Sequence, residues 1–194
     1  MIDYAAFVTT TVDTASWYFR TPESWLTLAL VAVVGYAVAG PIARSSGWNV
    51  WGTRVALWGL GGALVPTFVA RLGYYDLHLD LAAGCSPVLE DWVSVNSLLN
   101  LALLVPLGAG LAWASRSLLV SAAGVVTVAV AIEVGQALSG LGACERGDFL
   151  RNALGGLAAA ALVRLWQVGT GPDQSRSNRS TSAMTGRSVA SHGT

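Results

Sequence analysis

Charged residues are scarce in this sequence. Only 11% of its 194 residues are Asp, Glu, Lys or Arg, whereas 54% are hydrophobic. A soluble domain carries roughly 25% charged residues, so the chain lacks the polar side chains that a water-exposed surface requires. Its 11 basic and 11 acidic residues balance to a formal net charge of zero. Because there is no basic surface field, nucleic-acid binding is excluded as a function.

The common motifs of nucleotide, cofactor and metal binding are also absent. There is no P-loop, no dinucleotide-binding glycine fingerprint and no Gly-x-Ser-x-Gly element of serine hydrolases. The two histidines, His78 and His192, have no Cys or acidic partner at the spacing of zinc ligands. We therefore expect no cofactor and no metal site.

Hydrophobic residues are gathered in long runs. A helix needs about 20 residues to cross the roughly 30 Å hydrocarbon core of a bilayer. Five segments approach this length, namely 25–43, 51–70, 97–114, 118–138 and 149–166. The sequence thus predicts an all-α fold, a polytopic transmembrane bundle of about five membrane-spanning helices over 25–167. The fifth segment has the shortest uninterrupted apolar part, so a buried or re-entrant helix is an alternative there.

The two ends of the chain differ from this bundle. Residues 1–24 alternate polar and aromatic side chains, which predicts an interfacial segment outside the cytoplasm. Residues 168–194 are rich in Ser, Thr, Gly and Arg and poor in large apolar side chains. Such a composition cannot bury enough apolar surface to fold, so we expect a disordered cytoplasmic tail.

The arginines predict how the bundle is oriented. Cytoplasmic loops carry an excess of basic residues, and basic residues mark the loop near Arg44 and Arg54, the turn at Arg116 and the chain from Arg164 onward. The other loops contain more acidic residues. We therefore expect a multi-pass protein of the cell membrane with its amino terminus outside and its carboxyl terminus inside.

The two cysteines lie in loops that this topology places on the same outer face. Cys85 belongs to the loop between the second and third predicted helices, and Cys144 to the loop between the fourth and fifth. An oxidising outer compartment permits a disulfide between them, whereas a reducing one keeps both as thiols. Both alternatives stay open at this point.

Polar residues cluster near the outer ends of the last three predicted helices. Polar groups inside membrane-spanning helices usually face the bundle interior or a water-filled cavity. Three pairs of these residues are spaced three or four apart, which places the members of each pair on one helix face. The pairs are Asn96 with Asn100, Glu133 with Gln136, and Asp148 with Asn152. The predicted ligand-binding residues are Asn96, Asn100, Glu133, Gln136, Arg146, Asp148, Arg151 and Asn152.

These side chains suit several roles. Glu133 needs a cationic or hydrogen-bonding partner away from water, and Arg146 and Arg151 are the nearest candidates in the sequence. With the amides they would form a pocket for an anionic headgroup. Asn96 and Gln136 are alternatively hydrogen-bonding contacts between helices, and Asp148 is alternatively a helix N-cap.

Three sequence blocks in this region resemble the VanZ-like family of small bacterial membrane proteins. They are NSLLNLALLVPLG at 96–108, IEVGQ at 132–136 and RGDFLRNALGG at 146–156. The resemblance covers the motif-bearing part at 96–167. It implies a protein of the bacterial cell membrane and cell envelope, associated with low-level resistance to teicoplanin-type glycopeptide antibiotics and without an established reaction.

Glycopeptides bind cell-wall precursors outside the membrane, which is the side where the polar cluster is predicted. We therefore expect a binding or accessory protein, in contact with membrane lipids, that recognises a lipid-linked or anionic envelope component. One alternative is an intramembrane enzyme with Glu133 or Asp148 as general base and catalytic residue. Another is an assembly partner that binds no ligand.

Overall fold

The computed structural model describes residues 22–72, 77–79, 85, 94–142 and 144–170. Helices dominate these residues, in the order α2 (Pro22–Ser46), α3 (Val50–Thr67), the short 3-10 helix η1 (Val69–Arg71), α4 (Val95–Leu103), α5 (Val105–Ser115), α6 (Leu118–Ser139) and α7 (Arg146–Gly169). The prediction of an all-α bundle is confirmed. The chain divides into two units, Met1–Arg164 and Leu165–Thr194, and the bundle described below belongs to the first.

The predicted terminal segments fall mostly on residues outside this description. Of the interfacial segment predicted at 1–24, only 22–24 are described, and they begin α2. Of the tail predicted at 168–194, only 168–170 are described, and α7 continues as far as Gly169.

Four segments are long and apolar enough to cross a membrane. They are Pro22–Ser46, Val50–Arg71, Val95–Ser115 and Leu118–Ser139. Helix α7 matches them in length, with 24 residues, but polar residues near both of its ends lower its mean hydropathy. The sequence segment at 149–166 therefore corresponds to a long helix that is less apolar than the other four.

The third predicted span is broken in the middle. Helix α4 ends at Leu103, Leu104 leaves the helical conformation with φ −98° and ψ 6°, and α5 begins at Val105. Pro106 causes this break, because proline has no N–H for the preceding turn and its ring crowds that turn, whereas the first turn of a new helix tolerates it. The break separates the polar face of α4 from the apolar α5.

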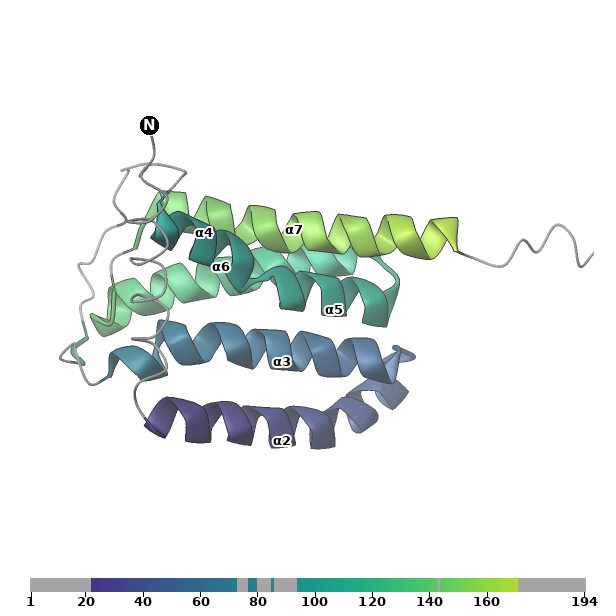
Figure 1. Cartoon of the computed structure of the whole chain (residues 1–194), viewed down its shortest axis with the longest axis horizontal. Helices are drawn as coiled ribbons and strands as arrows, with labels where there is room; N and C mark the ends of the chain where they lie inside the picture. Colours follow the sequence, from purple (N-terminus) through teal and green to yellow (C-terminus); the bar gives the residue numbers. More distant parts are fainter. Residues whose placement is uncertain (1–21, 73–76, 80–84, 86–93, 143, 171–194) are drawn as a thin grey trace, which may run out of the picture. The chain divides into compact units, whose positions relative to one another are not determined.

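The helices pack closely through small residues. Figure 1 shows α3 between α2 and α5. A Cβ atom added to Gly59 of α3 would lie 3.0 Å from the Cα of Leu107 in α5 and closer still to its nitrogen, so these backbones touch. Because lipid is as apolar as the helices, such close packing contributes much of their association. The buried core consists of Ala56, Ala63, Leu104, Leu107, Val125, Ala129, Ile132 and Ala153.

The helix directions bring several ends together. Helix α3 and η1 end, α4 begins, α6 ends and α7 begins at the same end of the bundle (Figure 1). We call it the polar end, because Glu133 near the end of α6 lies there with Asp148 at the start of α7 and Asn96 at the start of α4.

Candidate functional site

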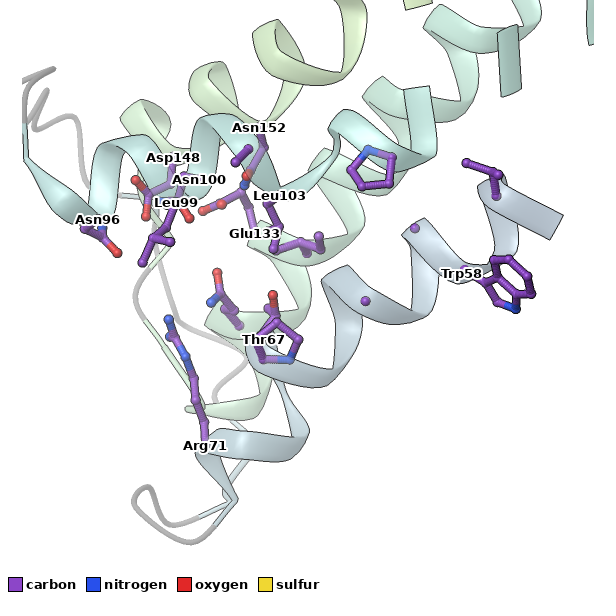
Figure 2. Close-up of a pocket in the computed structure, with 18 residues that line it drawn as sticks. Trp58, Thr67, Arg71, Asn96, Leu99, Asn100, Leu103, Glu133, Asp148 and Asn152 are labelled. Atoms are coloured by element: carbon purple, nitrogen blue, oxygen red, sulfur yellow. The ribbon is translucent and has the colours of Figure 1, made fainter. Parts of the chain in front are cut away.

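A cavity of about 490 Å³ lies at the polar end and extends along α3 (Figure 2). Its lining brings together six of the eight side chains predicted from the sequence. These six are Asn96, Asn100, Glu133, Gln136, Asp148 and Asn152. These six come from α4, α6 and α7, so three separate segments of the chain contribute the predicted polar lining.

Glu133 is the most deeply placed carboxylate of the cavity, with 4% of its surface exposed. Its Oε2 accepts a hydrogen bond of 2.9 Å from the backbone N–H of Glu145, in the loop before α7. Its Oε1 is buried and has no hydrogen-bond partner among the described residues. One oxygen thus holds the side chain in place, and the other remains available to a donor in the cavity.

Two amide side chains also contain a buried polar atom that lacks a partner among the described residues. The Nδ2 of Asn100 and the Oδ1 of Asn152 are buried without a hydrogen-bond partner in the part of the chain that the structure describes. Figure 2 shows Asn100, Asn152 and Glu133 gathered in the same part of the cavity. A buried polar atom without a partner costs about 1–3 kcal/mol. Three such atoms in one cavity offer a ligand one donor and two acceptors.

The two arginines of the RGDFLRN block occupy different environments. Arg151 is 1% exposed and forms a 2.9 Å ion pair with Asp148, three residues earlier on α7. Arg146 is exposed and does not line the cavity. The two arginines predicted as ligand-binding residues, Arg146 and Arg151, are thus both absent from the lining of the cavity. Asp148 lies in the first turn of α7, beyond the N-cap position, where a negative charge is favourable for the helix dipole.

The comparisons with known proteins concern this same part of the chain. A family model described as VanZ/LLP1 matches residues 25–167. The chain belongs to the VanZ/LLP1 family. The resemblance inferred from the three sequence blocks is thereby confirmed, and all lining residues of the cavity fall within the matched range. No curated protein and no solved structure matches the chain.

One cation that lines the cavity of this VanZ/LLP1 protein was not among the residues predicted from the sequence. Arg71, the last residue of η1, lines the cavity and donates a 3.1 Å hydrogen bond through an Nη atom to the carbonyl oxygen of Leu141. Figure 2 shows its side chain extending from η1 toward the labelled polar residues. Its charge could have identified it from the sequence, because Arg71 is a basic residue next to a predicted loop in which acidic residues predominate.

A disulfide joins Cys85 and Cys144, whose Cα atoms are 4.6 Å apart. The structure thus adopts the first of the two alternatives left by the sequence. Cys144 is buried and directly precedes Glu145, the backbone donor to Glu133. The bridge therefore fixes the loop that holds the Glu133 carboxylate.

The chemistry of the site is that of a hydrogen-bonding pocket with charges of both signs. Asp148 and Arg71 line the cavity with Glu133, and the backbone of Glu145 donates to it, so charges of both signs lie near this carboxylate. Among the described residues, no three His, Cys, Asp or Glu side chains gather as a metal site would require. The arrangement suits a ligand that donates to Glu133 and presents an acceptor to Asn100 or Arg71.

Proposed function

We propose that this VanZ/LLP1 membrane protein binds a lipid-linked or anionic component of the bacterial cell envelope in the cavity at its polar end. The observation that carries this proposal is the buried Oε1 of Glu133, which faces the cavity without a partner among the described residues. A carboxylate that is buried away from water is costly unless it is paired and hydrogen-bonded. A ligand that donates to this oxygen would offset part of that cost.

The neighbouring side chains favour a ligand over a purely structural role. If the polar residues only joined helices, their buried donors and acceptors would be paired with one another. Instead, Asn100 and Asn152 each have a buried atom beside Glu133 that has no partner among the described residues. This pattern argues against an assembly partner without a ligand.

Arg71 supports a ligand that carries negative charge. A guanidinium binds phosphate or carboxylate oxygens through several parallel donors, and Arg71 lines the same cavity as Glu133. A headgroup with both a phosphate and hydroxyl groups satisfies the whole set, because the phosphate accepts from Arg71 and Asn100 while hydroxyls donate to Glu133 and Asn152.

The disulfide supports an outward-facing polar end. Disulfides form and persist in oxidising compartments, and the bond between Cys85 and Cys144 lies at this end of the bundle. The orientation proposed is therefore amino terminus out and carboxyl terminus in. Binding of an outer-leaflet envelope component is the route by which the protein would contribute to low-level teicoplanin-type resistance.

An intramembrane enzyme is the second candidate function. Two carboxylates, Glu133 and Asp148, line one cavity, and a buried carboxylate near a bound hydroxyl is suited to act as a general base. Asp148 is engaged by Arg151, so Glu133 is the better candidate for that role.

Substitution of Glu133 by Gln separates these functions. The purified full-length protein in detergent is mixed with phosphatidylglycerol, which carries a phosphate and hydroxyl groups, and bound lipid is counted by native mass spectrometry. We expect wild type and the exposed-site control Arg146→Gln to retain the lipid, and Glu133→Gln to retain about tenfold less. Equal retention by all three proteins contradicts the proposal.

The same samples test the enzyme alternative and the resistance link. Chemical conversion of the lipid by wild type but not by Glu133→Gln favours the enzyme. In cells, we expect deletion to increase teicoplanin susceptibility, and Arg146→Gln but not Glu133→Gln to restore the original level. An impermeant thiol reagent applied to intact cells before and after reduction tests whether Cys85 and Cys144 face outward.

A further inference from the structure

The cavity has an apolar half that the polar residues do not explain. Figure 2 shows Trp58 well away from the labelled polar side chains. Between them, the wall is formed by α3 on one side and by α4 and the start of α5 on the other. The residues of this half are Val55, Trp58, Gly59, Gly62, Pro66, Ala102, Leu103 and Pro106.

Several residues of the apolar half also lie on the outer surface of the bundle. Trp58, Gly62, Ala102 and Pro106 line the cavity and are exposed. All four belong to segments long and apolar enough to cross a membrane. The cavity is thus bounded, between α3 and the broken helix α4–α5, by exposed residues of two candidate membrane-spanning segments.

Gly62, on the α3 wall of the cavity, is not required by close packing between helices. A Cβ atom added at Gly62 would have no atom of the described residues within 4 Å, whereas one added at Gly59 would collide with the backbone of Leu107. Glycine lowers the stability of a helix by up to about 1 kcal/mol relative to alanine. No described neighbour of Gly62 is close enough to require glycine at this position. The absent side chain leaves space on the α3 wall of the cavity.

We infer that the ligand of this protein is a membrane lipid that enters sideways between Gly62 and Ala102 and leaves its hydrocarbon chain in the apolar half. The inference rests on the proposed function and names the class of ligand for the same site. A water-soluble headgroup would leave the apolar wall without a partner. A lipid keeps its chain among apolar groups while its headgroup reaches Glu133 and Arg71, so no chain has to leave the hydrocarbon.

Filling the opening tests the inference. Gly62→Leu and Ala102→Leu each place a large side chain at the rim from opposite walls, and Ala158→Leu adds the same side chain at an exposed position of α7 outside the cavity. Phosphatidylglycerol carrying a photoreactive diazirine in its acyl chain is crosslinked to each full-length protein in nanodiscs, and the modified peptides are identified by mass spectrometry. We expect crosslinks on the α3 peptide containing Gly62 in wild type and Ala158→Leu, and about tenfold less in the two rim variants.

Competition by the deacylated headgroup distinguishes a lipid from a soluble ligand. We expect glycerophosphoglycerol to displace the labelled lipid only at concentrations far above those of unlabelled phosphatidylglycerol. Equal potency of the two competitors overturns the inference, as does undiminished crosslinking in both folded rim variants. If those variants bind normally while Glu133→Gln does not, only the sideways route fails, whereas normal binding by Glu133→Gln removes the proposed function itself.

Discussion

The backbone N–H of Glu145 donates a 2.9 Å hydrogen bond to the Oε2 of Glu133, twelve residues earlier in the chain. This bond connects the end of α6 to the loop that precedes α7. Because Cys144 next to Glu145 is bonded to Cys85, the disulfide, the loop and the buried carboxylate form one connected unit. Glu133 is therefore held through its Oε2 and presents its Oε1 to the cavity.

The first prediction concerns this disulfide. Reduction should lower the stability of the protein by roughly 2–4 kcal/mol, because the bond closes a long loop in the unfolded chain. It should also reduce lipid retention, since the loop that holds Glu133 loses its anchor. Thermal unfolding and native mass spectrometry in detergent, with and without reductant, measure both effects.

The double variant Cys85→Ser/Cys144→Ser is the control for the reductant. It should unfold at the temperature of the reduced wild type and should not respond to reductant. If oxidised and reduced wild type unfold at the same temperature and bind equally well, the disulfide does not anchor the loop.

The second prediction contrasts two arginines on α7. Arg151→Met should destabilise the protein by about 3–5 kcal/mol, because it takes the cation away from the partly buried carboxylate of Asp148. Arg146→Met removes an exposed charge and should change the stability by about 0.5 kcal/mol or less. Chemical denaturation in mixed micelles compares the two variants, and similar losses from both would contradict the assigned positions.

The third prediction concerns the contact between α5 and α7. A Cβ atom at Gly108 would lie 2.7 Å from the carbonyl carbon of Gly156, so Gly108→Ala forces two backbones apart. We expect a loss of about 1–3 kcal/mol.

Gly124→Ala provides the comparison for this contact. Its Cβ would approach the Cδ1 atom of Leu111 at 2.6 Å, and the far end of a side chain moves more easily than a backbone. Thermal unfolding should show little change for Gly124→Ala, and a larger loss from it than from Gly108→Ala would argue against the close approach of α5 and α7.

The fourth prediction tests the charge of the cavity. Arg71→Gln should weaken phosphatidylglycerol binding about tenfold, since a hydrogen bond to a charged group contributes roughly 1.5–3 kcal/mol. Arg54 lies near the opposite end of α3, over the rings of Tyr36 and Trp51 at 3.9 Å and 4.4 Å. Arg54→Gln should leave lipid binding unchanged, and native mass spectrometry with the two variants decides whether Arg71 has a specific role.

Much of the fold could be predicted from the sequence because the relevant signals are local. Hydropathy over about 20 residues located the spanning helices. The spacings of Asn96 with Asn100 and of Glu133 with Gln136 placed each pair on one face of its helix, and all four line the cavity. The family resemblance also rested on short contiguous blocks.

Other features depended on how the helices pack. Arg146 and Arg151 are equivalent by composition, but the rotation of α7 buries Arg151 beside Asp148 and leaves Arg146 exposed. Arg71 is distant in sequence from Asn96, Glu133 and Asp148, so only the end of α3 beside α6 could bring it to them.

The sequence by itself determined the helical segments and the faces on which their polar residues lie, because bilayer thickness and the period of the helix act within a single segment. Only the tertiary structure decided that Gly62 lines the cavity, that Cys85 is bonded to Cys144 and that Glu133 has one oxygen without a hydrogen-bond partner among the described residues. Each of these depends on distances between segments far apart in the chain, and such distances follow from packing rather than from local pattern.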